Sequence, residues 1–121
     1  MNPNKNRRSG CPVACTLDIL GDKWTLLIVR DLLHGATQFD ELRNAPEGIA
    51  RNILSHRLRQ LTDMGMVKRE PDISDKRRFN YRLTERGESL RPILQSIAQW
   101  GLQNIDNTET LSDDSVNRSH E

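Results

Sequence analysis

The sequence has few cysteines and no long run of apolar residues, and each shortage excludes a class of protein. Cys11 and Cys15 are its two cysteines, too few for a disulfide-stabilised scaffold, and we expect both to be reduced. No apolar run approaches the length needed to cross a bilayer, and the first ten residues, MNPNKNRRSG, contain no apolar stretch typical of a signal sequence. These features predict a cytoplasmic protein with no membrane partner.

The residues that most often build catalytic and metal sites are also sparse. His34, His56 and His120 are scattered along the chain, and no cluster of Cys, His and acidic residues has the spacing of metal ligands. No glycine-rich phosphate-binding loop is found either. The sequence therefore predicts that the protein is not an enzyme, with no catalytic residues, no metal site and no cofactor.

The formal net charge of +1 hides an uneven distribution of charge. Residues 51–82 contain nine Lys or Arg and four Asp or Glu, a local balance of +5, whereas residues 106–121 contain one Arg and five acids, a balance of −4. Nucleic-acid affinity depends on where charge lies, so the basic stretch is more informative than the total. For 121 residues we expect one domain over residues 11–105, between a flexible basic arm (1–10) and a disordered acidic tail (106–121).

Residues 50–65, ARNILSHRLRQLTDMG, have the pattern of an amphipathic helix that ends at Gly65. Its apolar residues recur every three or four positions and predict one buried stripe: Ile53, Leu54, Leu58, Leu61 and Met64. The opposite face is polar: Arg51, Asn52, Ser55, His56 and Arg59. Such a face is either a solvated helix surface or a surface that binds something flat and polar. Asn and Arg can pair with base edges, and Ser and His can reach a base or a phosphate.

Two segments after this helix have the composition of strands. MVKRE (66–70) and FNYRL (79–83) flank the turn-rich loop PDISDKRR, which ends in the cations Lys76, Arg77 and Arg78. A helix with a polar face followed by a basic hairpin suits double-stranded DNA, because the helix fits the major groove and the loop can reach phosphates or the minor groove. We therefore predict that the five polar helix residues and the three loop cations bind DNA.

The first part of the chain predicts two supporting helices. One starts at Cys11 and runs to Leu20. Asp22 can cap the next, over residues 23–34, which Gly35 closes. The residues expected in the central core are Trp24, Leu27, Ile28, Leu32 and their neighbours.

A helix-turn-helix pattern follows. Residues 36–38 are short enough for an edge strand, and Thr37 with Asp40 fits a capping box that opens a small helix over residues 39–45. Residues 46–48 form the turn into the main helix. The small helix is thus expected to brace the main one.

Thr84 can cap a final helix over residues 85–105, in which Pro92 should cause a kink. This helix carries an apolar stripe but follows the hairpin and has little core left to cover. The first helix also has apolar residues on two sides. We therefore predict that the first and last helices form a dimer interface, with contributions from Cys15, Ile19, Leu94, Ile97, Trp100 and Gly101.

Several separate motifs occur in an order found in one family of bacterial regulators. They are CPV at residues 11–13, LGDKWTLLIVRDLLHG at 20–35, FDELR at 39–43, GIARNILSHRLRQLTDMGMVKR at 48–69, and YRLTERGESL, PIL and AQWG between residues 81 and 101. The chain resembles the HxlR-type winged helix-turn-helix transcriptional regulators. The resemblance implies a mainly α fold with a small antiparallel β-hairpin (α+β), and a homodimer that binds a two-fold DNA operator, usually as a repressor. It also implies that the first and last helices pair.

Two positions depart from the family pattern. Ala50 stands where many relatives have a capping Ser, and the loop DISDKRR differs from the Pro-rich wing common in the family.

The resemblance also bears on Cys11, because the matching cysteine senses oxidants or electrophiles in several relatives. The exposed amides of a helix start, with Arg7 and Arg8 nearby, favour a thiolate at Cys11. The β carbons of Cys11 and Cys15 would lie roughly 5 to 6 Å apart, beyond the usual span of a disulfide. Oxidation across the dimer, or capping by a small thiol, is the predicted response to an oxidant or electrophile as inducer. The alternative interpretation is an unreactive capping cysteine.

Two other functions stay open on the sequence alone. One is a winged-helix module that binds another protein. The other is a MarR-type or ArsR-type regulator that responds to a small ligand or a metal, although the missing ligand cluster argues against a metal sensor.

Overall fold

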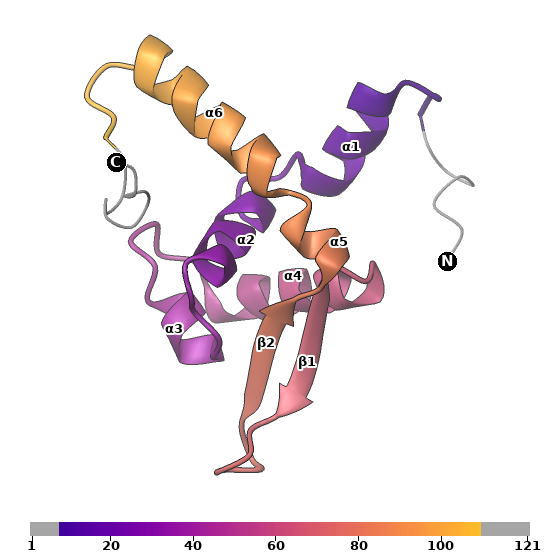
Figure 1. Ribbon diagram of the computed structural model, residues 1–121, viewed down its shortest axis with the longest axis vertical. Coiled ribbons are helices and arrows are strands. Elements are labelled where there is room, and N and C mark those ends of the chain that lie inside the picture. The colour runs from indigo at the N-terminus through magenta and orange to yellow at the C-terminus, as the bar shows by residue number, and fades with distance from the viewer. Residues whose placement is uncertain (1–7, 110–121) are drawn as a thin grey trace.

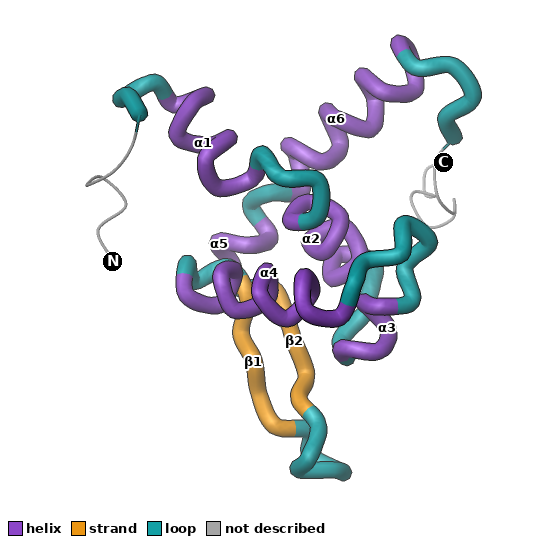
Figure 2. Tube along the Cα trace, turned by 180° about the vertical axis from the view of Figure 1, so that it is seen from behind, coloured by secondary structure: helices purple, strands orange, loops and turns teal. Residues whose placement is uncertain are grey.

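The computed structural model describes residues 8–109, which are mainly helical with one small antiparallel sheet. The elements in chain order are α1 (Pro12–Leu20), α2 (Thr25–Leu33), α3 (Phe39–Arg43), α4 (Arg51–Asp63), β1 (Val67–Pro71), β2 (Phe79–Leu83), α5 (Glu85–Glu88) and α6 (Arg91–Asn104). Figure 1 and Figure 2 show α1 and α6 extending from the body of the protein on the side opposite to the tip of the hairpin. No helix within residues 8–109 combines the length and the apolar character that a membrane span requires.

The predicted basic arm and acidic tail fall mostly outside the described residues. Of the arm, residues 8–10 are described, and of the tail, residues 106–109. The predicted flexibility of both segments therefore stays a prediction.

The apolar stripe of α4 forms the centre of the core. Leu54, Leu58 and Leu61 are buried, as the periodicity of this segment predicts, and Ile53 and Met64 are half-buried beside them. The buried leucines belong to one cluster with residues of α2, β1 and β2. This packing orients the opposite face of α4 toward solvent.

The core residues predicted for α2 are correct in part. Ile28 and Leu32 are buried, and so is their neighbour Val29. Trp24 and Leu27 are half-buried. Trp24 precedes the first residue of α2, and its ring lies at the edge of the core, 5.0 Å from the Lys23 ammonium.

The two predicted strands form the hairpin. β1 and β2 pair antiparallel, from Val67 opposite Leu83 to Pro71 opposite Phe79. The predicted edge strand at residues 36–38 is reduced to a single bridge between Gln38 and Asn80. This bridge ties the loop before α3 to the hairpin.

The predicted capping box of α3 is wrong by one residue. The N-cap is Gln38, and the carboxylate of Glu41 accepts hydrogen bonds from the N–H groups of Thr37 (2.8 Å) and Gln38 (3.0 Å). The backbone carbonyl of Thr37 is engaged with β2, where it accepts from the N–H of Tyr81 at 2.7 Å. Because Thr37 belongs to this contact with the hairpin, the helix starts after it.

The predicted continuous helix over residues 85–105 is also wrong, because the chain forms two helices there. Thr84 caps α5, as predicted, by accepting from the N–H of Gly87 at 3.2 Å. However, α5 ends at Glu88, and Pro92 lies in the first turn of α6. In a continuous helix Pro92 could not donate to the carbonyl of Glu88, whereas in a first turn it needs no amide proton.

The two terminal helices contribute little to the core. No residue of α6 is buried, and in α1 only Leu20 is. Their exposed apolar side chains are Val13, Leu17, Ile93, Ile97, Trp100 and Leu102. Of these, Trp100 is 61% exposed. A patch of this kind is typical of a surface that meets a partner.

Asp22 both caps α2 and joins it to α4. Its Oδ2 atom accepts from the N–H groups of Trp24 (2.9 Å) and Thr25 (3.0 Å) and from Nε of Arg57 (3.0 Å). Burial alone would raise the pKa of Asp22, but the hydrogen bonds from Thr25, Trp24 and Arg57 outweigh it and lower the pKa from 3.8 to about 2. The ionised carboxylate therefore stabilises the fold above about pH 4, and this contribution is lost as the pH falls toward about 2.

We expect Asp22→Ala to lower the free energy of unfolding by about 2 kcal/mol at neutral pH, because the cap and the partner of Arg57 are both removed. The difference from the wild type should shrink as the pH falls from about 4 to about 2. Urea unfolding at one fixed protein concentration measures both effects.

Asp63→Ala is the control, since the side chain of Asp63 is exposed and makes no hydrogen bond or ion pair within residues 8–109. This variant should stay within about 0.5 kcal/mol of the wild type. A loss for Asp22→Ala that does not change with pH would contradict the assignment of the stabilisation to the ionised carboxylate.

Candidate nucleic-acid interface

The polar face of α4 is exposed along its length. All five residues predicted to bind DNA lie on it: Arg51, Asn52, Ser55, His56 and Arg59. None of these side chains forms a hydrogen bond or an ion pair within residues 8–109, and the Arg51 guanidinium lies 5.2 Å from the ring centroid of Phe39. The donors and acceptors of this face are therefore free to contact a ligand.

Two ion pairs hold α4 in its orientation. Arg57 lies on the other side of the helix and pairs with Asp22 at 3.0 Å. In the turn before α4, the carboxylate oxygens of Glu47 accept from the two Nη atoms of Arg30, each at 2.8 Å. Hydrogen bonding to Glu47 raises the pKa of Arg30, and hydrogen bonding to Arg30 lowers the pKa of Glu47. Both pairs therefore stay ionised at neutral pH and connect α4 to α2.

The loop of the hairpin, residues 72–78, is organised around Asp72. The Oδ2 atom of Asp72 accepts from Oγ of Ser74 (2.6 Å) and from the N–H groups of Ser74 (3.0 Å) and Asp75 (2.9 Å), while Oδ1 accepts from Nδ2 of Asn80 (3.0 Å). These bonds, led by the one from the Ser74 hydroxyl, lower the pKa of Asp72 to about 2. The turn presents Ile73, which is 95% exposed and which the sequence did not single out.

The three cations of the loop have different environments. Lys76 is exposed and makes no ion pair within residues 8–109. Arg77 is also exposed but lies 3.2 Å from Oδ1 of Asp75. Arg78 turns back toward α3, where its Nη1 donates to Oε1 of Gln38 at 2.9 Å. Lys76 and Arg77 are therefore exposed in the loop, and Arg78, next to the loop end of β2, contacts the start of α3.

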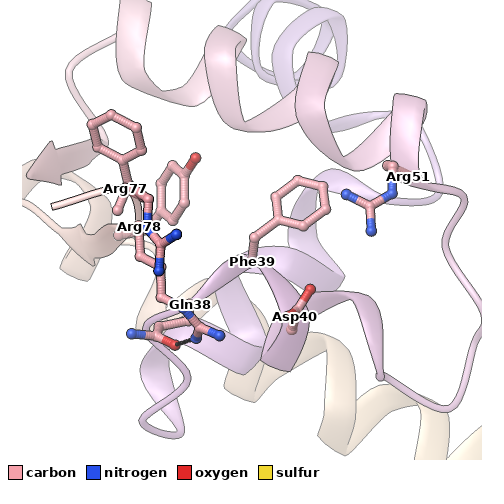
Figure 3. A pocket seen from close by; sticks show the side chains of 8 residues that line it. Gln38, Phe39, Asp40, Arg51, Arg77 and Arg78 are labelled. Atoms are coloured by element: carbon pink, nitrogen blue, oxygen red, sulfur yellow. Dashed lines mark hydrogen bonds between the residues drawn. The ribbon is translucent and has the colours of Figure 1, made fainter. Parts of the chain in front are cut away.

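A cavity of about 310 Å³ lies between α3, the first residue of α4 and the part of the hairpin formed by the end of its loop and the start of β2 (Figure 3). Its lining consists of Gln38, Phe39, Asp40, Arg51, Arg77, Arg78, Phe79 and Tyr81. Three of these residues, Arg51, Arg77 and Arg78, were predicted from the sequence to bind DNA. The other five were not, and no local motif marks them as a site, because the cavity joins segments that are distant in the sequence.

The two cysteines lie at the start of α1. Cys11 is the exposed N-cap residue of this helix, and its N–H donates to Oγ of Ser9 at 3.2 Å. Cys15 is half-buried, and its thiol donates to the carbonyl of Ser9 at 3.3 Å. Arg8, expected to increase the positive potential at Cys11, pairs instead with Asp18 at 2.6 Å. Arg7 lies outside the described residues.

Comparisons with known proteins connect this arrangement to a family. Residues 19–109 match the HxlR-like helix-turn-helix family. Over 97 residues the chain is 42% identical to an uncharacterised HTH-type transcriptional regulator of Mycobacterium tuberculosis, and the match covers 79% of this chain and 60% of that protein. The chain thus spans about 60% of the length of the mycobacterial relatives that it matches.

Solved structures of transcription regulators share the fold. The crystal structure of PA1607 superposes with a TM-score of 0.77 at 39% identity, over 90% of this chain and 79% of that chain. The redox regulator HypR in its reduced form has a TM-score of 0.70 at 34% identity, over 79% of this chain and 95% of that chain. The predicted fold class, a winged helix-turn-helix with a small antiparallel hairpin, is confirmed.

The relatives are regulators of transcription, which agrees with the prediction that the protein is not an enzyme. The chain belongs to the HxlR-like family of helix-turn-helix transcriptional regulators.

Proposed function

We propose that the protein is a sequence-specific DNA-binding repressor that acts in the cytoplasm as a homodimer on a two-fold operator. The observation that carries the proposal is the common cavity of α4 and the hairpin. Arg51 of α4 and Arg77 and Arg78 of the hairpin loop line the same space, so the start of α4 and the hairpin loop belong to one surface. A helix and a loop that share one basic surface can contact a groove and the adjoining backbone together.

In this proposal the side chains of the α4 polar face read the major groove. Asn52 and Arg59 can make bidentate hydrogen bonds to adenine and guanine edges, and Ser55 and His56 can reach a base or a phosphate. Lys76 and Arg77 are exposed in the hairpin loop and contact the backbone. Arg78 and Arg51, at the inner part of the surface, contact the phosphates between the two elements.

The homodimer is proposed to form through α1 and α6. These two helices leave apolar side chains exposed on the side opposite to the hairpin tip, so a partner there leaves the DNA-binding surface open. The residues proposed for the interface are Cys15, Ile19, Leu94, Ile97, Trp100 and Gly101. Burial of their apolar surface would favour the association.

A redox response is proposed for Cys11. Its thiol is exposed at the end of α1, one of the helices proposed to pair, so a bond from Cys11 to a partner thiol or to a small thiol would alter the position of that helix. The likeness to HypR, a redox regulator, supports this proposal. The inducer is then an oxidant or a small electrophile.

Two alternative functions can be distinguished from this proposal, one by a DNA-binding assay and one by the arrangement of possible metal ligands. A protein-interaction module would not bind the neighbouring intergenic DNA in preference to random duplexes. A metal-responsive regulator would need a ligand cluster, and within residues 8–109 no three His, Cys, Asp or Glu side chains are arranged to hold a metal ion.

Arg59→Ala should weaken binding to the operator by about 1 to 3 kcal/mol and reduce the preference for operator over random DNA, because a contact to a base is lost. A triple variant with Lys76, Arg77 and Arg78 replaced by Ala should weaken both DNAs about equally. It should also flatten the dependence of affinity on salt by at least about one unit of slope.

Fluorescence anisotropy at several salt concentrations measures both effects. Arg86→Ala serves as the control, since it removes an exposed cation from α5. Equal losses on operator and random DNA for Arg59→Ala would argue against a role in reading bases.

Ile97→Glu should convert the dimer into a monomer, because a carboxylate would be buried in the apolar interface. Ile97 is 51% exposed in the single chain, so the fold of the protomer should persist. Gln95→Glu adds the same charge at an exposed position of α6 and should remain a dimer. Sedimentation velocity at micromolar concentration distinguishes the species, and a monomeric wild type would refute the proposed dimer.

Diamide or a quinone should release the wild-type protein from its operator, and reduction by dithiothreitol should reverse the diamide effect. Cys11→Ser should bind the operator normally and no longer respond, whereas Cys15→Ser should respond like the wild type. Anisotropy with and without the oxidant measures the change. If Cys11→Ser is released as readily as the wild type, Cys11 is not the sensor.

A further inference from the structure

The cavity between α3, the start of α4 and the hairpin is lined by more than the cations that DNA phosphates would contact. Besides its cations it is lined by the rings of Phe39, Phe79 and Tyr81. A phosphate group gains nothing from aromatic walls, and its size is small relative to about 310 Å³. This volume falls at the lower end of the range for small-molecule sites, roughly 300 to 1,000 Å³.

Tyr81 supplies a polar group inside this lining. The residue is 9% exposed, and its hydroxyl makes no hydrogen bond within residues 8–109. Its backbone is fixed, since its N–H donates to the carbonyl of Thr37 at 2.7 Å. Because the hydroxyl has no partner within residues 8–109, it is available to donate to an acceptor atom in the cavity.

The charges of the lining favour an anion. Three arginines face one carboxylate, that of Asp40. Arg77 and Arg78 are partly neutralised by Asp75, at 3.2 Å and 3.7 Å. Arg51 has no ion-pair partner within residues 8–109, and its guanidinium lies near the Phe39 ring on the side of the cavity opposite to Arg77 and Arg78 (Figure 3).

We propose that this cavity binds a small aromatic carboxylic acid. The ring packs among Phe39, Phe79 and Tyr81, and the carboxylate pairs with Arg51 or Arg78 and accepts from the Tyr81 hydroxyl. Each part of such a molecule has a counterpart in the lining. A neutral ring leaves Arg51 without an ion-pair partner, and a bare oxyanion leaves the aromatic walls without a contact.

A bound acid would oppose DNA binding, because Arg51, Arg77 and Arg78 are also among the proposed phosphate contacts. This consequence rests on the proposed function, whereas the binding of the acid does not. An aromatic acid would thus be a second signal, acting at a site distant in the sequence from Cys11.

The test uses the full-length protein without DNA and benzoate as the probe. Tyr81 is the only tyrosine of the chain, so protein labelled with ¹³C-tyrosine gives signals of a single ring. Benzoate, titrated at constant ionic strength, should shift these signals to saturation. Benzyl alcohol, which has the ring without the carboxylate, and inorganic phosphate should each bind at least about tenfold more weakly.

Variants locate the site. Arg51→Ala should weaken benzoate binding about tenfold, and Arg82→Ala, which removes an exposed cation of β2 that does not line the cavity, should leave it unchanged. Tyr81→Phe, followed through the backbone amide signals of residues 38 and 51, should weaken it about fivefold. Unchanged benzoate affinity in both Arg51→Ala and Tyr81→Phe overturns the proposal, as does a benzoate response no larger than that of phosphate.

Anisotropy with a labelled operator duplex tests the consequence. Saturating benzoate should weaken operator binding at least about fivefold at constant ionic strength. If benzoate binds the cavity and operator affinity does not change, the competition is refuted and the acid site stands. If the protein binds benzoate but no DNA, the proposed function fails and the acid site again stands.

Discussion

The burial of the leucine stripe of α4 is the contact on which the functional surface depends. Leu54 and Leu61 are fully buried and Leu58 is 2% exposed, in one cluster with residues of α2, β1 and β2. Truncation of a buried leucine costs about 2 to 5 kcal/mol, a large share of the roughly 5 to 15 kcal/mol that stabilises a domain. Because these leucines fix the rotation of α4 about its axis, the polar face must point outward. The same packing therefore provides both stability and the orientation of the proposed reading face.

Two ion pairs and two glycines complete this arrangement. Asp22 and Glu47 each receive an arginine, Arg57 from α4 itself and Arg30 from α2, so the helix and the turn before it are held to one support. At the other end Gly65, with φ +75°, ends the helix and lets the chain enter β1 directly. A β carbon on Gly87 would overlap the carbonyl of Met66, so only glycine lets α5 pack this closely on the start of β1. The hairpin is thereby fixed relative to α4, and the two can act on one duplex.

The sequence predicts the elements with strong local patterns and misses those set by contacts between distant segments. The spacing of the leucines predicted the buried stripe and the polar face of α4, and Gly65 predicted its end. The composition of residues 66–70 and 79–83 predicted the hairpin. The break before α6 depends on how Pro92 is accommodated, and a helical pattern continues on both sides of it. The position of Arg78 depends on Gln38, forty residues earlier. The cavity joins three segments, and no window of the sequence contains them all.

In the proposed complex, two copies paired through α1 and α6 present their α4 helices to successive turns of one duplex. Selection of bound sequences from a pool of random duplexes tests this claim most directly. The account predicts enrichment of two inverted half-sites whose centres are separated by about 10 base pairs, or a multiple of this helical repeat, with two protomers on each duplex. Enrichment of a single half-site bound by one protomer, or no enrichment of any sequence, would contradict it.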